Sequence, residues 1–283
     1  MFDVLIDALK DSLMIFPFVA LIYVLMEAVE NSRNKDKILR LLKGDFAPLV
    51  GSVFGVIPEC GFPVMCAKLY DNGLIAVGTL LSVFISSSDE GIIILLSGGA
   101  DVFDVILLAG YKILFGCCFG LIINVLSGNK TRERRNTDGD DCLECGERQE
   151  GNFRKYVLHP FMHTAKVFIY VLIVNAVFGT LFFMVGEDSL FGIFSGAEAF
   201  SPLIAPAFGL IPNCATSIAL SQAYMQGFIP FCALVSGLVS NAGMGLIVLF
   251  RKKENLKNNL ILAVVLYFSG VISGYIAMAP SLF

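Results

Sequence analysis

The chain has 283 residues, of which 56% are apolar and 16% are charged. Soluble domains contain about 45–50% apolar and about 25% charged residues, so this composition excludes an ordinary soluble domain and predicts an integral membrane protein. The net charge of −4 excludes little, because the position of each charge matters more in a membrane protein than the sum.

Six apolar stretches are long enough to cross a membrane, since a helix needs about 20 mostly apolar residues to do so. In chain order they are 10–29, 74–97, 102–127, 161–185, 228–250 and 260–280. Between them lie two pairs of shorter apolar segments, 46–57 with 60–70 and 200–211 with 214–225. At about 1.5 Å per residue each short segment reaches half way across. Each pair therefore predicts a helical hairpin with its tip near the midplane, or two tilted full crossings with the same topology. The predicted fold is all-α, with about ten membrane helices.

The positive charges predict which loops face the cytoplasm. Of the 20 Lys and Arg residues, 16 fall in the three segments 30–45, 128–160 and 251–259. Cytoplasmic loops of membrane proteins are rich in Lys and Arg, so we expect these segments inside the cell and both termini outside the cytoplasm. The expected location is the plasma (inner) membrane, crossed several times.

An internal repeat organises the chain. A shift of 154 residues aligns Phe46–Leu95 with Phe200–Leu249 without a gap, and 17 of the 50 aligned pairs are identical. The alignment predicts repeat 1 at 1–127, a cytoplasmic linker at 128–160 and repeat 2 at 161–283. Each repeat has three full crossings, and its hairpin adds an even number of passes. The second repeat is therefore expected to be inverted relative to the first.

Two polar interruptions recur in each repeat. One is the hairpin tip, VIPECG and LIPNCA, where proline breaks the helical hydrogen bonds; the other is the centre of the next span, ISSSDEG at 85–91 and VSNAGMG at 239–245. Inverted repeats with interrupted helices are typical of secondary transporters, whose site lies at the midplane between the repeats. The residues predicted to bind the substrate are Glu59, Cys60, Ser86, Ser87, Ser88, Asp89, Glu90, Asn213, Cys214, Asn241 and Met244.

The chemistry of these residues favours a cation. Ionisable groups at membrane depth are unfavourable and are therefore candidates for function. Carboxylate and amide oxygens suit Mn²⁺, whereas thiolates suit softer ions such as Zn²⁺ or Cd²⁺. The predicted ligands of the transported ion are Glu59, Cys60, Asp89, Glu90 and Cys214. Two other interpretations stay open: a cysteine in a membrane helix is often a small apolar filler, and Asp89 and Glu90 also fit a proton relay or a salt bridge with a lysine.

Lys112 is the candidate partner in such a bridge. It lies ten residues into its span, too deep to reach the surface easily, and the repeat pairs it with Leu266. In one role, its positive charge would neutralise a carboxylate when the substrate is absent, so that transport exchanges protons or charge. In the other role, it would be the counter-charge of an anionic substrate. The second option keeps open an exporter of an oxyanion such as arsenite or arsenate, or of a small organic anion.

The predicted linker carries a generic metal-binding pattern. Cys142 and Cys145 have C-x2-C spacing, and the only two histidines of the chain, His159 and His163, follow them. This order fits a zinc site, although Pro160 separates the histidines and His163 falls in the next span. A metal-binding linker and an ordinary solvated loop both stay open. Thiols on the cytoplasmic side are expected to be reduced.

On these residues the chain resembles a known family. The twin motifs VIPECG and LIPNCA, the polar break after each, and a central loop with Cys and His are similar to the ten-helix (10TM) heavy-metal exporters, which are labelled arsenic efflux proteins or manganese transporters. The resemblance covers nearly the whole chain and implies export of a metal or metalloid across a prokaryotic plasma membrane. The central loop of this chain is poor in histidine, with only His159 at its edge, and this argues against a strong role of the loop in loading metal.

No enzyme motif accompanies these features. The sequence has no Walker A, GxSxG or HExxH motif, so we expect a carrier rather than an enzyme, either passive or coupled to H⁺ or Na⁺, with no resident cofactor. An ion channel is the nearest alternative. The expected partners are the lipid bilayer and the metal or metalloid, not nucleic acid; a homodimer would be common for such a carrier. The best single expectation is export of Mn²⁺ by alternating access.

Overall fold

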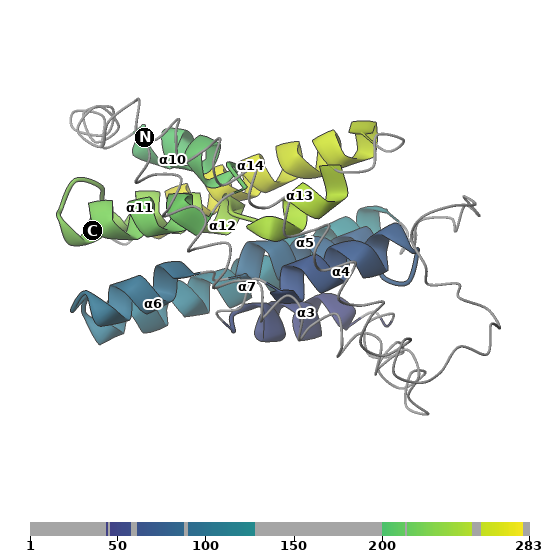
Figure 1. Cartoon of the computed structure of the whole chain (residues 1–283), viewed down its shortest axis with the longest axis horizontal. Coiled ribbons are helices and arrows are strands. Elements are labelled where there is room, and N and C mark those ends of the chain that lie inside the picture. The colour runs from purple at the N-terminus through teal and green to yellow at the C-terminus, as the bar shows by residue number, and fades with distance from the viewer. Residues whose placement is uncertain are drawn as a thin grey trace, which may run out of the picture.

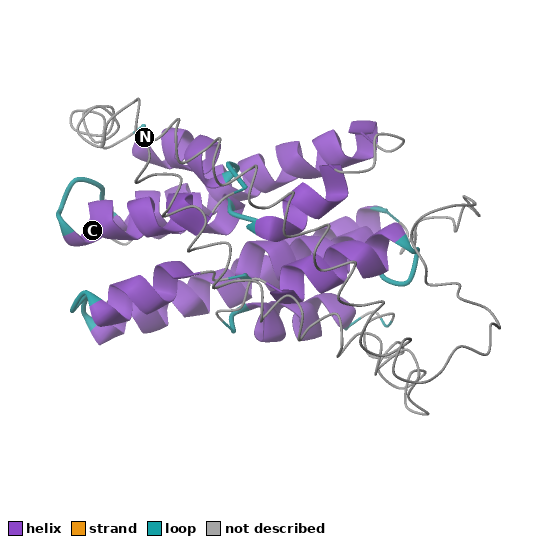
Figure 2. Cartoon of the chain, viewed as in Figure 1, coloured by secondary structure: helices purple, strands orange, loops and turns teal. Residues whose placement is uncertain are grey.

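The described part of the chain consists of helices joined by short loops (Figures 1 and 2). The computed structural model describes residues 44, 46–57, 61–87, 90–127, 200–212, 214–250 and 256–279. The helices of the first repeat are α3 (Ala47–Gly55), α4 (Gly61–Asp71), α5 (Val77–Ser86), α6 (Glu90–Ser97) and α7 (Val102–Leu126). Those of the second are α10 (Ser201–Gly209), α11 (Cys214–Met225), α12 (Phe231–Ser240), α13 (Met244–Phe250) and α14 (Leu256–Met278). The predicted all-α fold class is confirmed.

The helices repeat at the same spacing as the sequence. A shift of 154 residues places α3 on α10 and α5 on α12 with no change of length. It places α4, α6 and α7 on α11, α13 and α14 with differences of one or two residues at their ends. The turns after α4 and α11 also match, because each contains a glycine with positive φ, Gly73 at 68° and Gly227 at 76°. The sequence repeat is therefore a repeat of structure.

Four helical segments are long and apolar enough to cross a membrane: Val77–Ser97, Val102–Leu126, Phe231–Phe250 and Leu256–Met278. They confirm four of the six predicted spans, with ends that differ by a few residues, and the chain is a multi-pass membrane protein. The other two predicted spans, 10–29 and 161–185, lie outside the described residues, as does the linker with Cys142, Cys145, His159 and His163.

The predicted hairpin arms are short helices. α3 and α4 have 9 and 11 residues, and α10 and α11 have 9 and 12. At about 1.5 Å per residue, each covers about half of a bilayer core. The arms of one pair have different neighbours: α3 packs on α5 and α7, whereas α4 packs on α13 and α5. A hairpin that turns back at the midplane and two tilted full crossings both stay open as predictions for each pair.

The two interrupted spans form the centre of the bundle. Of an 18-residue apolar stretch in each span, 80% is buried in Val77–Ser97 and 89% in Phe231–Phe250, against 28% in α7 and 39% in α14. The outer faces of α7 and α14 carry exposed apolar side chains such as Phe103, Ile106 and Phe268. An apolar surface of this extent is unfavourable in water and suits hydrocarbon. α5–α6 and α12–α13 are therefore the protein-enclosed core.

Glycine and serine let the helices approach closely around this core. Gly120 of α7 lies against α5, where an added Cβ would come 2.7 Å from the Cβ of Ser82 and 2.8 Å from the carbonyl oxygen of Gly78. Gly274 of α14 lies against α12 in the same way, 2.6 Å from the Cβ of Ser236. Helices in membranes associate largely through such small residues, because lipid gives no hydrophobic driving force between them.

The two repeats pack on each other reciprocally. α4 packs on α13, α11 packs on α6, and α5 packs on α12. Exchanging the repeats leaves this pattern unchanged, as a pseudo-twofold relation requires. In Figure 2 the loop 72–76, between α4 and α5, lies at the right-hand end of the bundle, whereas the loop 226–230, between α11 and α12, lies at the left-hand end. Equivalent loops thus lie at opposite ends. A hydrogen bond from Tyr224 Oη to Asp104 Oδ2, at 2.6 Å, also joins the repeats.

We expect Gly120→Ala to destabilise the protein by about 1–3 kcal/mol, because the added methyl group would overlap α5. The measurement is the thermal unfolding midpoint of the full-length protein in detergent. Gly110→Ala is the matched control, since it lies on the same helix with nothing within 4 Å of the new Cβ. Equal midpoints for the two variants would contradict the close packing of α7 on α5.

The bond between Tyr224 and Asp104 predicts a coupling between the repeats. A double-mutant cycle of Tyr224→Phe and Asp104→Asn should give a coupling free energy of about 1–3 kcal/mol, as for a hydrogen bond to a charged group. Tyr267→Phe combined with Asp104→Asn is the control pair, because Tyr267 donates to the carbonyl of Leu203 instead. A coupling no larger than that of the control pair would argue against the contact.

Candidate functional site

The central breaks of the two repeats touch each other. α5 ends at Ser86 and α12 ends at Ser240. The next residues, Ser87 and Asn241, leave the helical conformation, with ψ angles of 128° and 103°. Ser87 Oγ donates a hydrogen bond to the carbonyl oxygen of Asn241 at 3.4 Å, and both residues are buried. Since Ser87 and Asn241 are equivalent positions of the repeat, the contact joins the same position of both repeats.

By length, this contact divides each interrupted span near its middle. α5 has 10 residues before the break and α6 has 8 after it. At about 1.5 Å per residue these lengths are about 15 and 12 Å, each close to half of a bilayer core of about 30 Å. The predicted interruptions at 85–91 and 239–245 are confirmed, because Ser87 and residues 241–243 are not helical. Backbone groups released at this depth need partners within the protein.

The side chain of Asn241 supplies one such partner. Its Oδ1 accepts a hydrogen bond from the backbone N–H of Gly243 at 2.9 Å, which forms an Asx turn. Gly243 has a φ of 52°, in the left-handed region that glycine adopts without strain. The turn carries the chain from the end of α12 to the start of α13 at Met244. Asn241, predicted as a substrate ligand, therefore also shapes the break itself.

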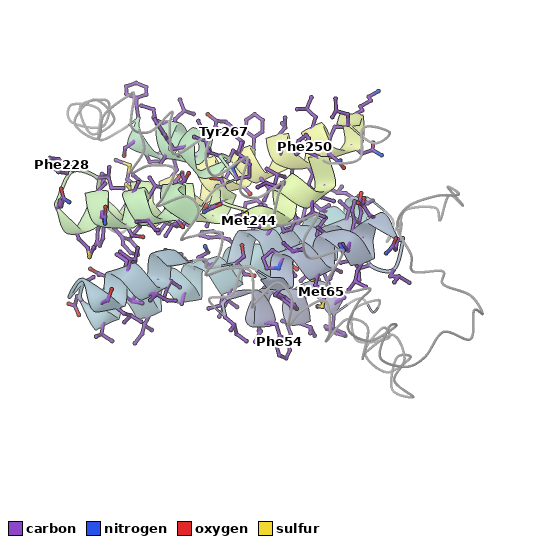
Figure 3. All side chains as sticks on the ribbon, in the orientation of Figure 1. Phe54, Met65, Phe228, Met244, Phe250 and Tyr267 are labelled. Atoms are coloured by element: carbon purple, nitrogen blue, oxygen red, sulfur yellow. The ribbon has the colours of Figure 1, made fainter. Side chains whose placement is uncertain are left out.

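α13 begins against the first repeat. Met244 is almost completely buried, and Figure 3 shows it where the ribbons of the two repeats meet. The next residue, Gly245, faces Phe84 of α5 and Pro63 of α4, where an added Cβ would come 2.6 Å from the ring of Phe84. The start of α13 and the start of α4 are thus neighbours. Helix starts carry partial positive charge, and helix ends partial negative charge.

α6 begins against a row of buried hydroxyl groups on α11. The row consists of Thr216, Ser217 and Ser221, each at most 1% exposed. Ser221 Oγ donates to the carbonyl oxygen of Gly91 at 3.2 Å, and Thr216 Oγ1 has no hydrogen-bond partner among the described residues. This row was not among the residues predicted from the sequence. The signal was in the repeat alignment, which pairs the three hydroxyl residues with Phe62, Pro63 and Ala67.

Lys112 of α7 connects both breaks. Its Nζ donates hydrogen bonds to the carbonyl oxygens of Ser87 and Leu238, the second at 2.8 Å, and the side chain is 1% exposed. Ser87 belongs to the first repeat and Leu238 to the second. The equivalent position in the second repeat is Leu266, which is fully buried. The predicted pairing of Lys112 with a carboxylate stays a prediction.

Ser86 and its equivalent Ser240 point into helix packing. Ser86 Oγ donates to the carbonyl oxygen of Ser82 at 2.8 Å, and it would collide with a Cβ at Gly55 of α3. Ser240 Oγ donates to the carbonyl oxygen of Pro206 at 3.1 Å. Ser86 thus faces α3, whereas its neighbour Ser87 faces the second repeat. Of these two serines, it is Ser87 that contacts the other repeat, at Asn241.

Several predicted ligands lie outside the described residues. These are Glu59, Cys60, Ser88, Asp89 and Asn213. Glu90 and Cys214 are the first residues of α6 and α11, and the structure describes their backbone but not their side chains. In the described part of the chain there is no group of three or more His, Cys, Asp or Glu side chains that would hold a metal. The cation site therefore stays a prediction from the sequence.

A protein-family model described as "Putative, 10TM heavy-metal exporter" matches residues 1–178 and 144–252, which together cover most of the chain. The searches of curated proteins and of solved structures give no match.

The role of Asn241 in the break predicts a specific loss. Asn241→Ala should lower the stability of the protein by about 0.5–2 kcal/mol, as for the loss of a helix cap, because the N–H of Gly243 loses its acceptor. Asn241→Ser should retain most of the stability, since a hydroxyl accepts the same kind of bond. Thermal unfolding midpoints in detergent give the comparison. Equal losses for both variants would mean that the Asx turn does not support the break.

Proposed function

Because the chain belongs to the family of 10TM heavy-metal exporters, we propose that it exports a divalent metal ion, with Mn²⁺ the first candidate, by alternating access at the two central breaks. The observation that carries the proposal is the contact between Ser87 and Asn241. It joins equivalent interruptions of the two repeats, and secondary transporters with interrupted helices bind their substrates between their repeats, near the midplane.

We infer that the two repeats have opposite orientations in the membrane. The opposite positions of the loops 72–76 and 226–230 support this inference, as does the reciprocal packing of α4 on α13 and α11 on α6. The segment 251–259, rich in Lys and Arg, follows α13 and should be cytoplasmic. The pair α4 and α13, toward the right in Figure 1, should then lie on the cytoplasmic side of the breaks, and the pair α6 and α11, toward the left, on the outer side.

This arrangement suggests how access alternates. Each cross-repeat pair closes one side of the site, so separating α4 from α13 would open it to the cytoplasm. Separating α6 from α11 would open it to the outside. Both movements are rotations of one repeat against the other about the contact of α5 with α12, which stays closed throughout. Small bistable shifts at packed interfaces are the usual source of such transitions.

The chemistry around the breaks supports a cation as substrate. The ends of α5 and α12 present partial negative charge at the centre. Asp89 and Glu90 follow Ser87 within three residues in sequence, and Glu59 and Cys60 directly precede α4, which packs on α13. Carboxylate and carbonyl oxygens suit Mn²⁺, while the thiols and the thioether of Met244 would admit softer ions.

The alternative of an anion exporter gains less support. It needs Lys112 as a counter-charge for the substrate, and the ammonium group donates to carbonyl oxygens of both repeats. To bind an anion, Lys112 would have to leave groups that themselves favour a cation. An oxyanion or a small organic anion is therefore the second candidate for the exported substrate, after a divalent metal ion.

The proposal predicts the outcome of three substitutions. In metal-sensitive cells, Glu59→Gln, Asp89→Asn and Cys60→Ser should each abolish resistance to the exported metal, since each removes a ligand that prefers cations. Membrane expression should equal that of the parent, and Gly110→Ala is the control for a harmless change. If all three variants protect the cells as well as the parent does, the cation site is wrong. Calorimetric titration of the purified protein with Mn²⁺, Zn²⁺, Cd²⁺ and arsenite would then identify which class binds.

A further inference from the structure

The ammonium group of Lys112 lies between the ends of two broken helices. It donates hydrogen bonds to the carbonyl oxygen of Ser87, just after α5, and to that of Leu238, in the last turn of α12. In unbroken helices these carbonyls would accept from the amides four residues further on, but α5 ends at Ser86 and α12 ends at Ser240. The ammonium is therefore bonded to carbonyls that the breaks have released, one from each repeat.

Carbonyl oxygens at helix ends are suitable ligands for a cation. A helix end carries a partial negative charge equivalent to about half an elementary charge. In secondary transporters, unwound carbonyls and the ends of half-helices coordinate the coupling cation. Here the ends of α5 and α12 meet in a buried region, where electrostatic interactions are stronger than in water. A compact monovalent cation suits this position. In this protein the ammonium group of Lys112, on α7, occupies it.

The repeat shows that packing alone does not require the lysine. The equivalent position of α14 is occupied by Leu266, which is completely buried and apolar. An aliphatic residue thus fills the same place in the same helix arrangement. The first repeat differs at this position by the positive charge of Lys112. Because the two breaks touch at Ser87 and Asn241, this one ammonium group can bind the ends of both helices.

We propose that Lys112 is a tethered cation that takes the place of a free coupling cation at the ends of α5 and α12. The parent protein then needs no Na⁺ or K⁺ at this position. Removal of the ammonium leaves a carbonyl site that a free alkali or small ammonium ion fills. The inference rests on the proposed function only in taking the chain to be a carrier, and it makes no assumption about which metal is exported.

The test is the cation dependence of stability in Lys112→Ala. The full-length parent and variant are purified in detergent, and thermal unfolding midpoints are measured in choline, Na⁺, K⁺ and methylammonium chlorides. The ionic strength is held at about 0.1 M throughout, so that screening is constant. No heavy metal is present, so failure of the metal-export proposal and failure of this one are distinguishable.

The parent should have the same midpoint in all four salts. Lys112→Ala should have a lower midpoint in choline and should recover at least half of the loss in Na⁺, K⁺ or methylammonium, because an ion that binds the folded state stabilises it. Leu266→Ala is the matched control: it opens a similar space at the equivalent position without releasing carbonyls to a cation. It should lose stability equally in every salt.

Two results would overturn the proposal. One is a Lys112→Ala midpoint that is lowered by the same amount in all four salts, and the other is a variant as stable in choline as the parent. If the variant does not survive detergent, the same salt series is run as limited proteolysis in unextracted membranes. Protection that depends on the cation supports the tethered-cation role, and protection that is equal in every salt refutes it.

Discussion

Backbone hydrogen bonding inside the membrane is the constraint on which this structure depends. Two helices that cross the centre of the bundle are interrupted at Ser87 and at residues 241–243, where hydrocarbon offers the released groups no partner. The protein supplies partners of its own. Asn241 accepts from the N–H of Gly243, Ser87 donates to Asn241, and Lys112 donates to one carbonyl from each repeat. The breaks are thus kept at the centre, where a carrier needs polar groups.

Close helix packing makes this arrangement possible. Gly120 and Gly274 bring α7 and α14 against the interrupted spans, and the serines of those spans fill the narrow spaces with hydroxyl groups bonded to nearby carbonyls. The outer helices then present apolar side chains outward, and the polar interruptions are enclosed. An exporter of metal ions requires this separation, because a charged substrate must meet polar groups without contact with lipid.

The two repeats share a fold but differ in chemistry. The first carries Lys112 and the acidic residues of the sequence motifs, whereas the second has Leu266, Asn241 and a row of hydroxyl groups on α11. The common helix order gives each repeat the same pair of short helices on either side of a central break. The two sequences thus differ in charge, because most of the charged residues of the motifs belong to the first repeat.

The sequence by itself determined the membrane class, the repeat, four of the spans and the positions of the central breaks. These features are local: length, apolarity, proline and a fixed offset of 154 residues are all visible in the order of residues. Only the tertiary structure decided that Ser87 contacts Asn241, that Ser86 faces α3 instead, and that Lys112 reaches carbonyls 25 and 126 residues away. Such contacts depend on how helices rotate and cross, which is set by the fit of Gly and Ser at their interfaces. The pattern of apolar residues does not encode that fit, because in a membrane helix nearly every face is apolar.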